Sequence, residues 1–167
     1  MKTTSLTKLD VAVSQLRFAI TLFLEDRELV SAITLAGAAE EILGKLATQA
    51  GLTPALTRRA EGTRALFKHL WKSDPGVKPF VNLKNKTRNE LKHLVSGAPI
   101  EVDLREEAMR ILDRAVENYR LLHVRRDAQI ATYESRRLQL WRPASPRTKA
   151  ILSTAPPHRG HHHGPFR

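Results

Sequence analysis

The chain has 167 residues, contains no cysteine and carries a formal net charge of +11 at pH 7. This length is sufficient to bury a hydrophobic core, and the lack of cysteine excludes a disulfide framework, a thiolate metal site and a cysteine nucleophile. The sequence has no secretion signal and no run of about 18 apolar residues, so we expect a cytoplasmic protein that does not enter a membrane.

The positive charge is concentrated in the last third of the sequence. Residues 120–167 contain ten Lys and Arg but only two Asp and Glu. Such a segment attracts polyanions, so we expect RNA as a partner. A solvated basic tail without a specific ligand is the alternative interpretation of the same composition.

The first helix is predicted from a stripe of apolar residues. Between Leu9 and Phe23 they recur at spacings of three and four, which places them on one face of a helix. Thr7 and Asp10 have the spacing of a capping box, in which each side chain accepts a hydrogen bond from the backbone of the other residue. We therefore expect a helix that begins just after Thr7.

A second helix is predicted from Leu29 to Ala50, with Gly51 directly after its end. It is apolar around most of its circumference, so we expect it to be the most buried helix. Gly37, Glu40 and Gly44 lie on a seam of mostly small residues, where another backbone can approach closely. If Glu40 is buried there, its carboxylate requires a partner; alternatively, Glu40 borders the core and reaches water.

Three further helices complete the prediction. One covers residues 61–71, the next begins near Pro79 and ends before Gly97, and a long one begins at Asp103 and continues to about Trp141, where its last part would project as a basic arm. We thus predict an all-α, up-and-down bundle of four to five helices over residues 1–141.

From Arg142 onward the sequence is rich in Pro, Ser, Arg and His and has no helical periodicity. We therefore predict a disordered basic tail over residues 142–167. The cluster of histidines at its end has no fixed geometry, so we expect neither a functional metal site nor a cofactor.

The fourth predicted helix contains the sequence TRNELKH at residues 87–93. On a helical wheel, one side is expected to face the core and carries Phe80, Leu83, Thr87, Leu91 and Leu94. The opposite side is polar and carries Asn82, Asn85, Lys86, Arg88, Asn89, Lys92 and His93.

The spacing within this motif limits which side chains can act together. Asn89 and His93 are four residues apart, so the amide can hydrogen-bond to the imidazole and set its tautomer. Arg88 and His93 lie about 140° apart around the helix. A two-fold dimer can bring Arg88 of one chain beside His93 of the other; alternatively, all three are solvated residues of a polar helix face.

Two segments resemble the HEPN superfamily, the higher eukaryotes and prokaryotes nucleotide-binding domains. Residues 88–93 resemble its motif of an arginine, a polar residue, a short spacer and a histidine. Residues 36–45, AGAAEEILGK, are similar to an alanine-rich helix with an acid and a lysine that recurs in the family. With the order of the helices, the resemblance covers roughly residues 7–125 and implies an all-helical fold.

The resemblance implies a metal-independent endoribonuclease, as found in toxin–antitoxin, phage-defence and RNA-processing systems. His93 would act as general base or acid, because its ordinary pKa of about 6.5 suits proton transfer near neutrality. Arg88 would stabilise the scissile phosphate, Asn89 would orient one of the two, and Glu40 would hold Arg88 in place.

The resemblance also implies binding partners. We expect RNA, a second copy of the chain and an antitoxin or other partner protein. Lys86 and Lys92 would bind phosphates that flank the scissile one, unless they are simply solvated helix charges. Arg125, Arg126, Arg136 and Arg137 would extend this track of positive charge.

Two features limit what the resemblance implies. Some HEPN toxins have a tyrosine two residues after the histidine, which a nucleotidyltransferase modifies, whereas this chain has Val95 there. Many HEPN domains also lack catalysis. The alternative function is therefore a non-catalytic helical module for dimerisation and for binding of a partner protein, a nucleotide or RNA.

Overall fold

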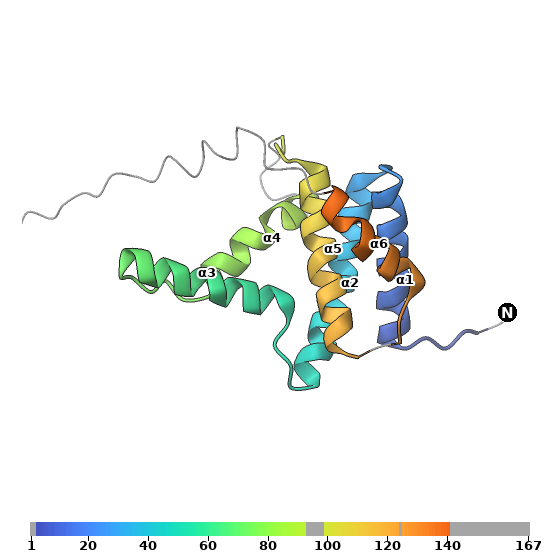
Figure 1. The fold of residues 1–167 in the computed structure, drawn as a ribbon, viewed down its shortest axis with the longest axis horizontal. Coiled ribbons are helices and arrows are strands. Elements are labelled where there is room, and N and C mark those ends of the chain that lie inside the picture. The colour runs from blue at the N-terminus through green and yellow to red at the C-terminus, as the bar shows by residue number, and fades with distance from the viewer. Residues whose placement is uncertain (1–2, 93–98, 124, 141–167) are drawn as a thin grey trace, which may run out of the picture.

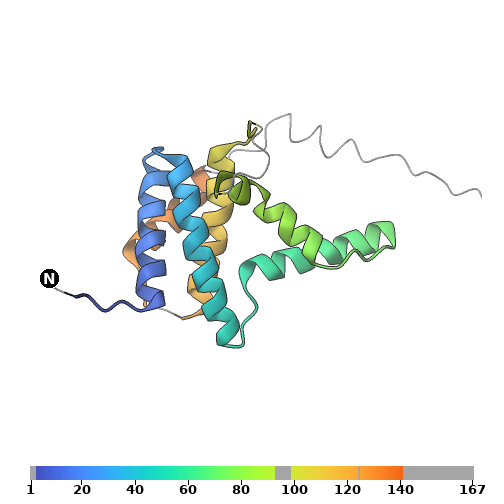
Figure 2. The same ribbon diagram turned by 180° about the vertical axis from the view of Figure 1, so that it is seen from behind.

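The computed structural model describes residues 3–92, 99–123 and 125–140, and this part of the chain is all helical, as predicted. It contains six helices rather than four to five: α1 (Lys8–Leu24), α2 (Leu29–Gln49), α3 (Ala55–Trp71), α4 (Lys78–Lys92), α5 (Leu104–Leu121) and α6 (Ala128–Leu140). Helices α1, α2, α5 and α6 gather into one body, from which the α3–α4 hairpin projects (Figures 1 and 2). The predicted tail at residues 142–167 lies outside the described residues.

The start of α1 follows the local prediction. The backbone N–H of Thr7 donates to Asp10 Oδ2 at 2.9 Å, and the backbone N–H of Asp10 donates to Thr7 Oγ1 at 3.1 Å. The predicted capping box is therefore confirmed. It satisfies two backbone donors that the first turn of a helix otherwise leaves without a partner.

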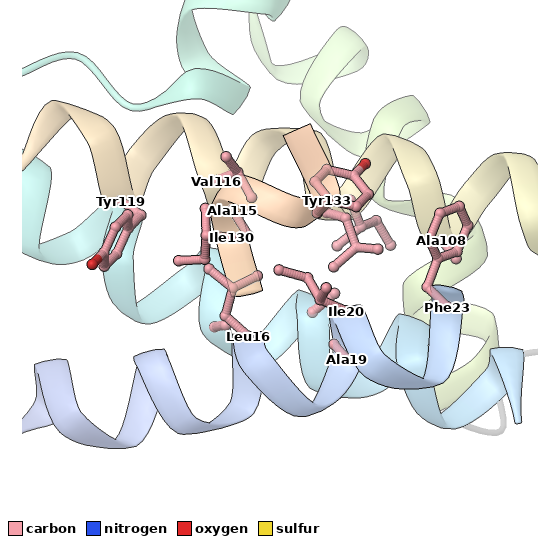
Figure 3. Packing of buried hydrophobic residues seen from close by; sticks show 14 of the residues in the cluster. Leu16, Ala19, Ile20, Phe23, Ala108, Ala115, Val116, Tyr119, Ile130 and Tyr133 are labelled. Carbon is pink, nitrogen blue, oxygen red and sulfur yellow. The ribbon is translucent and has the colours of Figure 1, made fainter. Parts of the chain in front are cut away.

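The core lies where α1, α2, α5 and α6 meet. Figure 3 shows Leu16, Ile20 and Phe23 of α1 facing α5 and α6. The phenol of Tyr133 from α6 is buried among them and donates a hydrogen bond to Asp113 Oδ1 at 2.8 Å. Burial and the neighbouring Asp113 carboxylate raise the pKa of Tyr133, so the phenol stays protonated.

The predicted long C-terminal helix is divided into α5 and α6. Asp127 begins α6, because its Oδ1 accepts the backbone N–H groups of Gln129 at 2.9 Å and Ile130 at 3.1 Å. Its Oδ2 also accepts a hydrogen bond from Arg17 Nε at 2.6 Å. The prediction of a projecting basic arm was wrong, because Ile130 and Tyr133 pack against the core instead.

Helices α3 and α4 form the projecting hairpin, which we call the arm from here on. Its first helix starts earlier than predicted. Helix α3 begins at Ala55 rather than at Glu61. The backbone N–H of Ala55 donates at 2.8 Å to the side chain of Asn118 on α5, which takes the place of a local N-cap. The distal end of the arm is held by aromatic rings, where Phe67 stacks on Trp71 and also contacts Phe80.

None of the helices that the structure describes is long and apolar enough to cross a membrane.

Candidate functional site

Helix α4 carries most of the candidate site, and its orientation differs from the prediction. Leu83, expected in the core, is 70% exposed. The residues that are partly buried on α4 include Val81, Lys84, Arg88 and Leu91, at helical spacings of three, four and three. Lys and Arg can occupy such positions because their aliphatic stems cover apolar surface while the charged ends find polar partners.

The Arg88 side chain passes directly over Gly37 of α2. Its Nη1 donates to Glu40 Oε2 at 3.3 Å and to the carbonyl oxygen of Gly37 at 3.4 Å. A Cβ at Gly37 would lie only 2.6 Å from Cδ of Arg88. The small residue therefore makes room for the arginine, and the contact between Glu40 and Arg88 expected from the sequence is present.

Glu40 is the centre of a buried ionic cluster. It is 3% exposed, so the alternative in which it reaches water was wrong. Its second oxygen, Oε1, accepts a hydrogen bond at 3.3 Å from Nε of Arg114, which is itself buried on α5. The Asn118 amide donates to the Glu40 carbonyl oxygen at 3.2 Å. One carboxylate thus bridges two guanidinium groups, and the trio has a net positive charge.

Further charged groups surround this cluster. Glu107 on α5 is buried, and burial raises its pKa, although the positive charges of Arg114 and Arg110 oppose the shift. Lys84 on α4 shows the opposite response, since burial and the nearby charges of Arg114, Arg59 and Arg110 lower its pKa. Lys84 thus lies near three guanidinium groups, each of which is itself paired with a carboxylate.

The guanidinium of Arg88 has hydrogen-bond donors that the ionic cluster does not use. Both contacts of Arg88 use Nη1, whereas Nε and Nη2 make no hydrogen bond within the described part of the chain. The guanidinium side chain remains 18% exposed. The Nε–Nη2 edge of an arginine is the fork that binds phosphates through two parallel hydrogen bonds.

The other predicted site residues are placed as follows. Asn89 and Lys86 are exposed on α4. His93 and Val95, as well as the Lys92 side chain, lie outside the described residues. The structure thus brings Glu40 and Arg88 together, and the pairing of Arg88 with His93 stays a prediction.

The four arginines that were expected to extend the phosphate-binding track lie between α5 and α6 and on α6. Arg137 forms an ion pair with Asp113 of α5, with Nε and Oδ1 2.6 Å apart. Arg125, Arg126 and Arg136 are exposed. Over residues 3–92, 99–123 and 125–140, no group of three His, Cys, Asp or Glu side chains that could hold a metal ion was found.

Arg114, Asn118 and Lys84 belong to the site but were not singled out in the sequence. Arg114 and Asn118 are four residues apart on the mostly apolar inner face of α5, where they form a short polar seam with the buried Glu107. Such a seam on a core-facing stripe indicates buried polar partners. Lys84 could have been found from its spacing, since it lies four residues before Arg88 and therefore on the same face of α4.

Comparisons of the chain with protein-family models, with curated proteins and with solved structures found no match.

Proposed function

We propose that this protein is a metal-independent endoribonuclease of HEPN type that acts as a toxin or phage-defence component. The proposal is supported above all by the contact of Arg88 with Gly37 and Glu40. This contact joins the two segments on which the resemblance rests, residues 36–45 and 88–93. It also fixes the guanidinium through Nη1, and Nε and Nη2 make no hydrogen bond with the described residues.

The proposed reaction needs only side chains and RNA. The imidazole of His93 takes the proton from a 2′-hydroxyl, and the 2′-oxygen attacks the adjacent phosphorus. The bond from phosphorus to the 5′-oxygen breaks, and that oxygen receives a proton from a general acid. The products are a 2′,3′-cyclic phosphate and a 5′-hydroxyl. Arg88 stabilises the negative charge on the phosphate oxygens through its Nε–Nη2 edge.

The proposed site is shared between two copies of the chain. Within one straight helix, Arg88 and His93 lie about 140° apart, so they do not meet on one phosphate. A two-fold axis beside α4 supplies Arg88 from one copy and His93 from the other. Asn89 then orients His93, and Lys86 and Lys92 bind the flanking phosphates.

The test is RNA cleavage by the purified protein in EDTA. We expect the wild type to release fragments that end in a cyclic phosphate and His93→Ala to be at least about 100-fold slower. A matched control is His123→Asn, an exposed histidine with a positive φ that asparagine tolerates; it should cleave as the wild type does. Cleavage that persists in His93→Ala, or that requires an added metal ion, would refute the mechanism.

A second candidate function is a non-catalytic module for dimerisation and ligand binding. It is favoured by the observation that Arg88 already has a carboxylate partner within the fold, as a purely structural arginine would. On this account Arg88→Gln lowers the stability of the protein, and neither the wild type nor the variant cleaves RNA. On the nuclease account, the wild type cleaves RNA and Arg88→Gln loses this activity.

A further inference from the structure

The arm has a charge unlike that of the body from which it projects. Residues 55–92 contain ten Lys and Arg against three Asp and Glu, whereas residues 1–54 and 93–140, which include the helices of the body, contain 13 against 14. The arm thus carries an excess of seven positive charges, and the rest of residues 1–140 is nearly neutral. Such an uneven distribution is typical of a surface that binds a polyanion.

Several cations on the arm lack a carboxylate partner. Lys72, Lys78, Lys84 and Lys86 form no ion pair within the described residues. Lys72 and Lys78 flank the hairpin turn, while Lys84 lies on the inner side of α4 near Arg59, Arg110 and Arg114. The positive charge therefore extends from the distal end of the arm to the body.

The distal end also offers an aromatic surface. The ring centroids of Phe67 and Trp71 are 4.8 Å apart in a stacked arrangement, and Phe80 of α4 lies against Phe67 at 5.8 Å. Trp71 is 48% exposed, although it is one of the largest apolar side chains in the protein. Aromatic rings that are supported from behind and interleaved with lysines suit the stacking of unpaired bases.

We propose that the arm binds single-stranded RNA, with bases on Trp71 and phosphates on the lysines at the hairpin turn and on α4. The inference rests on the proposed function, because the bound strand would run along α4 towards Arg88. Phe80, which contacts the Phe67 ring beneath Trp71, is eight residues before Arg88, a rise of roughly 12 Å along α4, and Trp71 lies beyond it. The arm would thus hold the substrate a short distance from the scissile phosphate.

The observations favour RNA over a second arm as the occupant. Two arms packed against each other would each bring seven excess positive charges, which repel. The exposed leucines of the arm, Leu66, Leu70 and Leu83, nevertheless offer apolar surface to a protein. Self-association through the arm is therefore the outcome that the experiment has to distinguish.

The test measures binding without cleavage. The probe is a fluorescent 2′-O-methyl oligoribonucleotide of about 12 nucleotides, which lacks the attacking hydroxyl and matches the span of single-strand sites. With the full chain, we expect Trp71→Ala to bind about tenfold more weakly and Trp71→Phe to bind nearly as the wild type does, because phenylalanine retains the stacking face.

Charge is tested by a second pair of variants at exposed positions. Lys72→Gln/Lys78→Gln should weaken binding and lower the slope of log affinity against log salt by about 1.4, or about 0.7 for each lost phosphate contact. The control, Lys8→Gln/Lys45→Gln, removes the same charge from exposed sites on α1 and α2 and should leave the slope unchanged.

The outcomes distinguish RNA binding by the arm from RNA cleavage at the proposed site. If both arm variants bind like the wild type, or if they change only the sedimentation of the protein, the RNA-binding arm is refuted, whether or not His93→Ala abolishes cleavage. If the arm variants lose binding but the wild type does not cleave RNA in EDTA, the arm is supported and the nuclease fails.

Discussion

The close passage of Arg88 over Gly37 leads to a prediction that does not depend on function. In Gly37→Ala, the new Cβ would lie 2.6 Å from Arg88 Cδ, so Arg88 must leave Glu40. Losing a charge-assisted hydrogen bond costs about 1.5–3 kcal/mol. Alanine inside a helix gains about 1 kcal/mol over glycine. We expect a net loss of stability of about 0.5–2 kcal/mol, because Arg88 can reach water and Arg114 still neutralises Glu40.

Gly62→Ala is the matched control for this prediction. Gly62 lies inside α3, and a Cβ there would meet no atom within 4 Å in the structure as described. Only the helix preference acts, so we expect a gain of about 0.5–1 kcal/mol. Urea unfolding followed by circular dichroism measures both variants. If Gly37→Ala stabilises the protein as much as Gly62→Ala does, Arg88 does not occupy the position described.

Three further predictions concern buried polar groups. Asn118→Ala removes the acceptor for Ala55 N–H and the donor to Glu40, and should cost about 2–3 kcal/mol in thermal unfolding. Burial raises the pKa of Glu107, so wild-type stability falls as pH rises from the ordinary glutamate pKa to this raised pKa. Glu107→Gln should therefore stabilise the protein at about pH 7 and have less effect at about pH 4, as urea titrations at both values would show. Burial alone would raise the pKa of Asp127. Hydrogen bonds from the Ile130 N–H and from Arg17 outweigh this effect, so the pKa lies below the ordinary aspartate value. Its contribution is present above the ordinary aspartate pKa and lost as pH falls through the lowered one, so Asp127→Ala should destabilise the protein at neutral pH and less in acid, as pH-dependent melting would show.

Local sequence signals predicted the elements whose causes are local. The stripe from Leu9 to Phe23 and the capping box of Thr7 and Asp10 each lie within one helix, so spacing alone identifies them. The break between α5 and α6 also has a local component, because Asp127 caps α6. Its position is stabilised by Arg17, 110 residues away in sequence, which no local pattern reveals.

The candidate site was predictable only in part for the same reason. The seam of small residues on the second helix indicated that another backbone approaches closely there, but the Arg88 side chain lies over Gly37 instead. Of the two alternatives for Glu40, the one with a partner is observed. The predicted orientation of α4 was wrong at Leu83, because the helical wheel assigned apolar residues to the core. It did not consider that the aliphatic stem of Lys84 can cover apolar surface in place of Leu83. The second arginine on Glu40, Arg114, required the packing of α5 against α2 to be known.

In the proposed mechanism, Arg88 and His93 of two copies of the chain form one RNA-cleaving site, and mixing two inactive variants tests this arrangement. Arg88→Gln and His93→Ala are each assayed alone in EDTA and then co-expressed with two different affinity tags. Each mixed dimer would contain one intact site of two, so dimers purified through both tags should regain about half of the wild-type rate. A mixture that stays as inactive as either variant alone, beside an active wild type, would contradict the claim.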